Sequence, residues 1–125
     1  MLQVKNYLEA GWMEWRKMHG SQAHGLDLVK MDNFAADMLQ FLPNEKTSLH
    51  THPGNHILFV VDGGGFLSYG DEEHILIKGT CYLVPGATPH RVSANDQGMY
   101  LLSIADTHQP VDSEKRSEII PDSIR

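Results

Sequence analysis

The sequence has 125 residues, of which 41% are hydrophobic and 21% charged, a composition typical of one globular domain rather than of a disordered chain. Ten Lys and Arg against 16 Asp and Glu give a formal net charge of −6, which disfavours nucleic acid and anionic membranes as partners. Cys81 is the only cysteine, which excludes an internal disulfide, and with no apolar leader or membrane-length apolar run we expect a cytoplasmic protein.

The first 25 residues precede the first strand-like run and are ambiguous in their local structure. Leu8, Trp12 and Trp15 fit one face of a helix, whereas residues 12–18 fit an edge strand equally well. The two tryptophans suit a dimer interface or a lid, and plain core packing explains them equally well. We expect residues 1–25 to form an arm that packs on the rest of the domain or on a partner subunit.

Residues 26–106 divide into short β-type runs separated by Gly, Pro, Asn and Asp, which is the pattern of an all-β sandwich or barrel. The expected strands are residues 26–31, 34–42, 57–61, 66–69, 74–77, 81–84 and 99–104. The glycine-rich stretches at residues 62–65 and 70–71 are interpreted as turns between them. The sequence therefore predicts a single all-β domain.

The run at residues 57–61, Ile-Leu-Phe-Val-Val, is apolar at every position instead of alternating. Such a strand is expected to be covered on both faces. One face fills the interior, and the other packs either on a second sheet of the same chain or on a partner subunit. We expect a homodimer.

A group of histidines carries the strongest functional signal. His50 and His52 are two residues apart at the end of an extended segment, so their side chains project to one face. The Pro-Gly-Asn stretch at residues 53–55 can turn the chain and return His56 toward the same point. His90 reaches this point only if two distant strands are neighbours. We predict that His50, His52, His56 and His90 bind one divalent transition metal.

These histidines lie in motifs that resemble those of the cupins, over roughly residues 34–104. The first cupin motif is Gly, five residues, His-x-His, three or four residues, Glu, six residues, Gly. Here His50, His52 and Gly63 match it, while His56 replaces the Glu and Asn44 replaces the leading Gly. Asn also adopts left-handed backbone geometry, so that replacement is tolerable.

The second cupin motif is Gly, five residues, Pro-x-Gly, two residues, His, three residues, Asn. Gly79, Pro85 and His90 match its spacing, whereas Gly86 is one position early and Ala94 replaces the Asn. The resemblance implies a jelly-roll-type double-stranded β-barrel and, with His56, a small single-domain cupin with a four-histidine metal site.

The replacement of Glu by His56 affects the expected chemistry. Four neutral imidazoles leave the full charge on the cation, which makes it a stronger Lewis acid. Imidazole ligands suit Zn, Cu, Fe and Ni, and the resemblance keeps Mn as a candidate. An octahedral metal would retain two open positions for water, dioxygen or substrate, and a tetrahedral one would be closed and structural.

The leading hypothesis is a metal-dependent enzyme that acts on a small oxygenated organic molecule. Dioxygenase-like oxidative cleavage ranks first, and isomerase, cyclase or lyase chemistry follows, because a fold does not determine function. The alternatives are a non-catalytic module that binds a sugar or another metabolite, and a metal that only stabilises the fold. The sequence identifies no general acid or base.

The remaining residues are interpreted as structural. His19, His24, His74 and His108 lack partner spacing and are expected at the surface, and Cys81 is expected in the core. Residues 107–125 are polar and charged, and we expect them to form a surface tail without chemistry.

Overall fold

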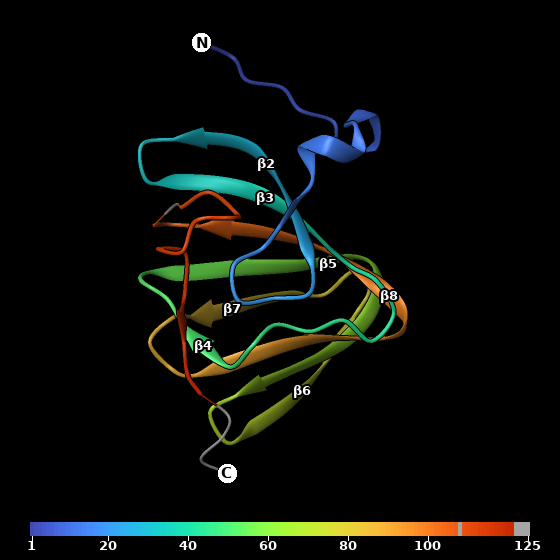
Figure 1. Cartoon of the computed structure of the whole chain (residues 1–125), viewed down its shortest axis with the longest axis vertical. Helices are drawn as coiled ribbons and strands as arrows, with labels where there is room; N and C mark the ends of the chain where they lie inside the picture. Colours follow the sequence, from blue (N-terminus) through green and yellow to red (C-terminus); the bar gives the residue numbers. More distant parts are fainter. Residues whose placement is uncertain (108, 122–125) are drawn as a thin grey trace.

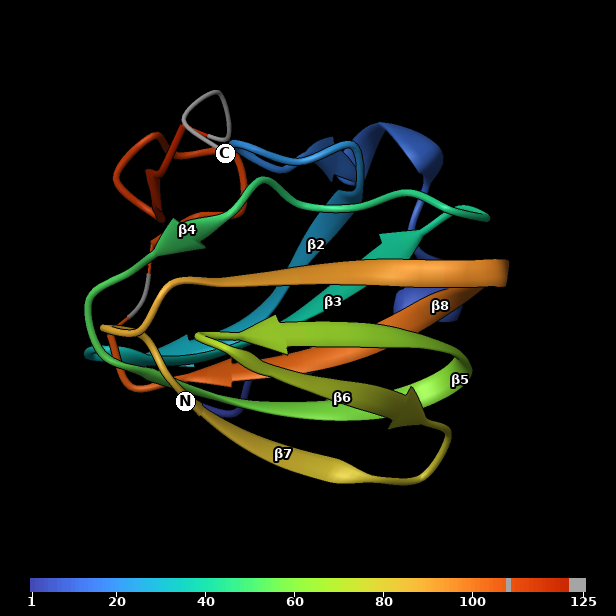
Figure 2. The ribbon, with the colours of Figure 1, turned by 90° about the horizontal axis from the view of Figure 1, so that it is seen from below.

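The computed structural model describes residues 1–107 and 109–121, and it is an antiparallel β structure that curls on itself (Figures 1 and 2). The strands are β1 (Arg16–Lys17), β2 (His24–Met31), β3 (Phe34–Phe41), β4 (His50–Thr51), β5 (Asn55–Tyr69), β6 (Glu72–Ile77), β7 (Cys81–Pro85), β8 (His90–Ala105) and β9 (Glu118–Ile119). Within the described residues the only helices are two single 3-10 turns. The all-β prediction is confirmed.

Two long strands, β5 and β8, run antiparallel and connect the two parts of the sheet. The end of β5 pairs with the start of β8, with Tyr69 opposite His90, and the start of β5 pairs with the end of β8, with His56 opposite Ala105. Strands β2 and β3 extend the sheet from the end of β8, while β6 and β7 pair with β5. The start of β8 is therefore brought beside β4, which carries His50.

The glycine-rich stretch at residues 62–65 is part of β5, and the prediction of a turn there was wrong. The pairing of β5 with β8 shifts register on both sides of Gly63, so the strand bends without ending. A Cβ at Gly63 would overlap the carbonyl oxygen of Gly98, and one at Gly65 would overlap that of Ser93. The glycines permit the close crossing of two bent strands. Likewise, β8 begins at His90, not at the predicted residue 99.

The apolar run at the start of β5 divides between the two faces of the sheet. Leu58 and Val60 are 5% and 0% exposed and belong to the core, whereas Ile57 and Phe59 are 40% and 36% exposed. Cys81, opposite Phe59 on β7, is also exposed, so its predicted place in the core was wrong. The register places Cys81 on the outer face, and the alternation of a strand decides this independently of residue type.

The N-terminal arm contains the 3-10 turns η1 (Tyr7–Glu9) and η2 (Trp12–Glu14), so no long helix is formed, and the edge strand expected over residues 12–18 is reduced to β1 at the edge of the sheet. The rings of Tyr7 and Trp15 both contact the ring of Tyr100 on β8. The arm therefore packs on the outside of the sheet near β3 and β8.

The described residues of the C-terminal segment pack against the barrel, and they do not form only the expected surface tail. Val111 is fully buried, and its side chain fills the space beside Gly25 that a Cβ would occupy. Strand β9 pairs with β4, with Ile119 opposite His50 (Figure 1). A buried valine, the pairing of β9 with β4 and the ion pairs of Arg116 with Asp37 and of Asp112 with Arg16 hold a segment that is otherwise polar. Composition does not reveal such contacts.

Candidate metal centre

Three strands position the predicted ligands. His50 begins β4 and lies directly opposite His90, the first residue of β8, so the two side chains are neighbours across the antiparallel pair. His52 follows β4, and its backbone N–H donates to the carbonyl oxygen of Gly86 in the loop before β8. His56 lies in β5, after a turn in which Gly54 has a φ of 72°. The predicted turn is found at residues 53–54, since Asn55 already belongs to β5.

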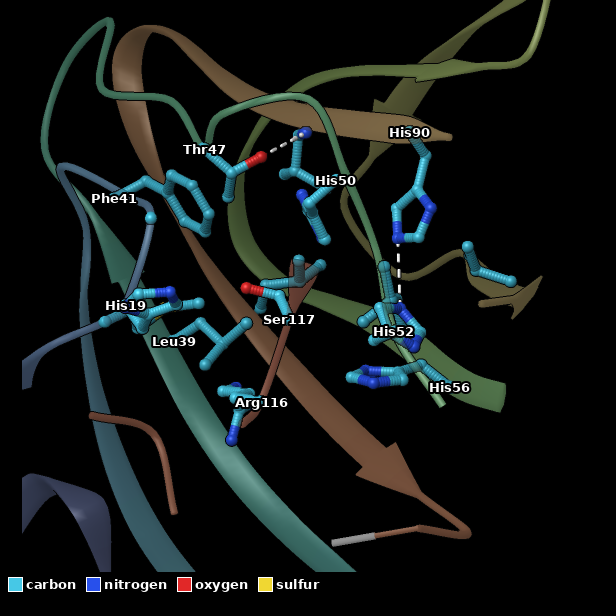
Figure 3. A pocket seen from close by; sticks show the side chains of 16 residues that line it. His19, Leu39, Phe41, Thr47, His50, His52, His56, His90, Arg116 and Ser117 are labelled. Carbon is cyan, nitrogen blue, oxygen red and sulfur yellow. Dashed lines mark hydrogen bonds between the residues drawn. The ribbon is translucent and has the colours of Figure 1, made fainter. Parts of the chain in front are cut away.

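His50, His52 and His90 form a cluster in which one nitrogen of each ring lies within 4.8 Å of the others. The Nε2 atoms of His52 and His90 are 3.0 Å apart, and the ring centroids of His50 and His90 are 4.4 Å apart. His56 lies next to this cluster, with its ring centroid 4.0 Å from that of His52 (Figure 3). The structure thus brings three of the four predicted ligands into one group and places the fourth beside it.

Backbone carbonyls orient two of the imidazoles. The carbonyl oxygen of Ser48 accepts a hydrogen bond from Nδ1 of His50 at 2.7 Å, and that of Thr88 accepts one from Nδ1 of His90 at 2.8 Å. A carbonyl oxygen only accepts, so Nδ1 carries the proton in both rings and Nε2 keeps its lone pair. Such second partners fix the ring orientation of metal-bound histidines in general.

Burial lowers the pKa of every imidazole in this group. Loss of hydration is the largest cause, and it lowers the pKa of His50 and His52 to about 4 and that of His56 to about 2. It also lowers the pKa of His90. All four rings are therefore neutral at pH 7, which is the form that binds metals.

The arrangement of nitrogen atoms fits a bound cation. The Nε2 atoms of His52 and His90 lie 3.0 Å apart in hydrogen-bond contact. Because Nδ1 of His90 carries the proton of that ring, Nε2 of His52 is the donor when no cation lies between them. A shift of this proton to Nδ1 of His52, which is directed at the carbonyl oxygen of Pro53 at 3.4 Å, would turn both Nε2 lone pairs toward a cation. Neutral imidazoles suit a divalent transition metal for this role.

The loop before β8 packs tightly against His52. A Cβ at Gly86 would overlap both the carbonyl oxygen and Nδ1 of His52, and it would also overlap the carbonyl oxygen of Gly54. The backbone N–H of Gly86 donates to that Gly54 oxygen at 3.0 Å. A glycine at this position is therefore required by contact, although the cupin motif places its glycine one residue later.

The four histidines line one buried pocket with a cavity of about 50 Å³ (Figure 3). Apolar side chains form most of the remaining wall; they are Met18, Leu39, Phe41, Leu58, Val84, Val92 and Leu101. Among the described lining residues there is no carboxylate. A cavity of this size holds roughly four water-sized groups, so it suits a small ligand.

Sequence reasoning missed two ionisable residues of this pocket. His19 and Arg116 both line it, although His19 was expected at the surface and Arg116 in a tail without chemistry. Neither residue has a local spacing signal, because each comes from a terminal segment that only the folded chain brings to the barrel. His74 is exposed on β6, as expected, and His108 lies outside the described residues.

The chain belongs to the cupin family, because the Cupin_2 family model, described as a cupin domain, matches residues 38–105, more than half of its length. No curated protein matches the sequence. Within the described residues no helix is both long and apolar enough to cross a membrane.

Solved structures with the same fold include a polyketide cyclase, KdgF and a salicylate dioxygenase. The polyketide cyclase RemF from Streptomyces resistomycificus is 19% identical, with a TM-score of 0.76 over 98% of this chain and 89% of its own. KdgF from Halomonas sp. is 16% identical, with a TM-score of 0.73 over 87% and 96%. A salicylate 1,2-dioxygenase from Pseudaminobacter salicylatoxidans is 19% identical, with a TM-score of 0.63 over 67% and 26%. At these identities the likeness establishes the fold alone.

Proposed function

We propose that this cupin is a metal-dependent enzyme in which His50, His52, His56 and His90 hold one divalent transition metal, Mn, Fe, Ni, Zn or Cu, beside a small oxygenated organic substrate. The observation that carries the proposal is the convergence of neutral imidazoles on one wall of a buried, mostly apolar pocket. His56 joins the set because its ring lies 4.0 Å from that of His52. Its Nδ1 pairs with Oγ of Ser103 at 2.9 Å, which leaves Nε2 as the candidate ligand atom.

The residues of the chain orient the ligands and exclude water. A bound divalent metal supplies Lewis acidity to a substrate oxygen and, where it is redox-active, reactivity toward dioxygen. The carbonyl oxygens of Ser48 and Thr88 hold two imidazoles in position before any ligand enters. The apolar wall removes competing water, which strengthens polar interactions inside the pocket.

Two reaction classes follow from this site. Oxidative cleavage is the first candidate, because the proposed metal has only imidazole ligands from the protein. The fold similarity to a salicylate 1,2-dioxygenase is consistent with this reaction. Cyclisation, isomerisation or lyase chemistry is the second candidate, favoured by the match to a polyketide cyclase over 98% of this chain. Dioxygen consumption separates the two, because only oxidative cleavage requires it.

The test of the metal site is elemental analysis of protein purified without added metal, followed by electron paramagnetic resonance. We expect one transition metal per chain and a spectrum that changes when small oxygenated molecules bind. Single His→Ala variants at positions 50, 52 and 90 should lose the metal, and the control His74→Ala should keep it, because His74 is exposed and pairs with Glu72. Absence of metal after reconstitution would refute the site.

The variant His56→Ala tests the fourth ligand separately. If four imidazoles hold the metal, this variant binds it more weakly and its resonance spectrum changes. An unchanged spectrum and unchanged affinity would restrict the site to the cluster of three.

A non-catalytic binding module is the competing function. The absence of a carboxylate among the described lining residues favours it, because few groups are then available for proton transfer. In that case the pocket binds a metabolite without turnover. If the metal is only structural, chelation lowers Tm while no small molecule alters the metal spectrum.

We also propose that the protein is a cytoplasmic homodimer with a small molecule, and neither nucleic acid nor membrane, as its partner. The exposed apolar side chains of Ile57, Phe59 and Leu83 support an interface on the outer face of β5 and β7. The free, exposed thiol of Cys81 suits a reducing compartment.

A further inference from the structure

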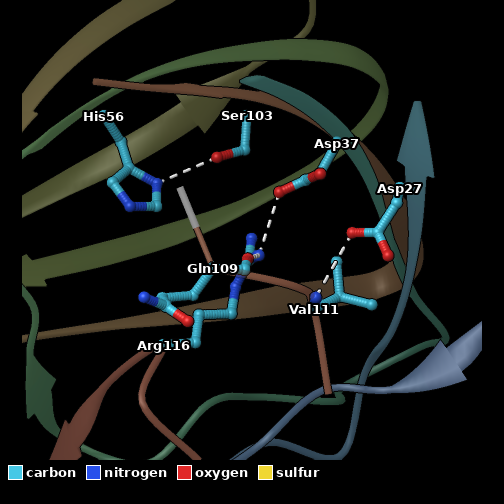
Figure 4. A network of polar contacts seen from close by, with 7 residues as sticks. All are labelled: Asp27, Asp37, His56, Ser103, Gln109, Val111 and Arg116. Atoms are coloured by element: carbon cyan, nitrogen blue, oxygen red, sulfur yellow. Dashed lines mark hydrogen bonds and ion pairs between the residues drawn. The ribbon is translucent and has the colours of Figure 1, made fainter. Parts of the chain in front are cut away.

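The C-terminal segment contributes a cation to the wall of the pocket. Nη1 of Arg116 donates to Oδ2 of Asp37 at 2.9 Å and to the carbonyl oxygen of Gln109 at 2.8 Å (Figure 4). The side chain of Arg116 is 9% exposed and that of Asp37 is 2% exposed. This ion pair is therefore held away from solvent, and Arg116 lines the same pocket as the histidines.

The contacts of Arg116 occupy only part of its guanidinium group. Among the described residues, Nη1 makes both hydrogen bonds that the side chain forms. A guanidinium carries five N–H donors, so those on Nη2 and Nε are left for another acceptor. The group is already fixed by Asp37, and binding a second acceptor therefore orders few additional rotatable bonds.

The charge of Arg116 reaches the histidine group. After burial, which is the largest cause, the Arg116 cation contributes to the lowered pKa of His50, His52 and His56. Asp37 is absent from the residues that line the cavity, so the cation and not its counter-ion faces a ligand. An anion in the cavity would meet Arg116 and the proposed metal together.

We propose that Arg116 determines specificity and that the pocket selects small organic anions, whose carboxylate or enolate oxygen accepts from the Arg116 guanidinium. The proposal rests on the proposed function, because it assumes that this pocket binds the substrate. A planar guanidinium matches a carboxylate better than any other side chain does. A neutral ligand of the same shape would leave buried donors without an acceptor, which is costly.

Acetate and acetamide are suitable probes, because each has four heavy atoms and the two differ in charge rather than shape, while the cavity of about 50 Å³ admits ligands of this size. The experiment titrates both into zinc-loaded, ¹⁵N-labelled protein and reads the dissociation constants from amide chemical shifts. Wild type should prefer acetate, and Arg116→Gln should reduce the acetate-to-acetamide preference by about tenfold or more. The same titrations on metal-free protein separate the contribution of Arg116 from direct binding to zinc.

The matched control is Arg16→Gln. Arg16 also pairs with an aspartate of the C-terminal segment, Asp112, but its side chain is 61% exposed and does not line the cavity. The control removes the same charge and should leave the acetate preference unchanged. An equal loss in both variants would indicate a general charge effect and would overturn the proposal.

Two further variants keep the test decisive if Arg116→Gln folds poorly. Arg116→Lys retains the charge without the planar fork, and it should keep part of the acetate preference. Asp37→Asn removes the counter-ion, so acetate should bind more tightly while the protein loses stability. Acetate affinity that stays constant in both variants would overturn the proposal.

The outcomes separate this proposal from the proposed function. Stoichiometric zinc in wild type and Arg116→Gln, together with the same acetate preference in both, overturns the role of Arg116 and leaves the metal site intact. Stoichiometric zinc with no binding of either probe also overturns it. If wild type fails to bind zinc, the metal site is refuted. If this zinc-free wild type still prefers acetate over acetamide and Arg116→Gln does not, the anion-binding role of Arg116 is supported without the metal site.

Discussion

The two faces of β5 are both apolar, but they pack in different ways. On the inner face, Leu58 and Val60 are covered by this chain, and Leu58 lines the pocket beside the histidines. On the outer face, Ile57 and Phe59 stay largely exposed, opposite Leu83 and Cys81 of β7. The inner face is therefore complete within one chain, whereas the outer face lacks a cover among the described residues. One face of this apolar strand thus fills the core, the other is left for the proposed interface, and altering each face alone separates the two roles.

Truncation on the inner face should have the largest effect. Leu58→Ala should lower the free energy of unfolding by about 2–5 kcal/mol, because it removes buried contacts and leaves a cavity. Phe59→Ala is the matched change on the outer face, and in the isolated chain it should cost much less. Chemical denaturation at low protein concentration measures both. Equal losses would contradict the division of β5 into two faces.

A charge on the outer face should come next. Leu83 is 72% exposed, so Leu83→Glu should leave the fold intact and weaken a dimer by about 2 kcal/mol, or roughly thirtyfold in dissociation constant. Sedimentation equilibrium gives the constant, and circular dichroism checks the fold. The control Met31→Glu places the same charge on an exposed apolar residue of β2. If the wild-type protein is monomeric at high concentration, the outer face of β5 and β7 is not a dimer interface.

A methyl group in the loop before β8 should have a smaller effect on stability and a specific effect on metal binding. Gly86→Ala should weaken metal binding by about tenfold or more, because the new Cβ displaces His52. Gly79→Ala is the control, since its Cβ meets no atom within 4 Å, although its φ of 86° adds backbone strain. Competition with a chromophoric chelator measures the affinity. Equal affinity in the two variants would argue against the contact with His52.

The pH dependence of the metal-free protein tests the burial of the histidines without any substitution. The unfolded histidines titrate near pH 6.5, whereas folded His50 and His52 have a pKa of about 4. Between these values the unfolded chain binds more protons, so the free energy of unfolding falls as the pH falls. Tm should decrease by about ten degrees between pH 7 and pH 5.5. His56→Asn should reduce this decrease, and a Tm that is constant over the range would indicate that the rings are not buried.

Much of the fold could be predicted because strand alternation and turn residues are local signals. Strands β2, β3, β6 and β7 lie within two residues of their predicted positions. The bend in β5 was mistaken for a turn, because a glycine run marks positions without a Cβ and does not distinguish a bulge from a reversal. Asn44, predicted to tolerate left-handed geometry, has a φ of 65°.

The sequence by itself determined an all-β domain and the meeting of His50 and His52, because two-residue alternation and short turns act over a few positions, and the resemblance of its histidine motifs to those of cupins implied the barrel. Only the tertiary structure placed His90 opposite His50, through the antiparallel pairing of β4 with β8. It also decided that Val111 is buried and that Arg116 enters the pocket. These contacts join residues far apart in the chain, and no local pattern encodes which distant segments will share a cavity wall.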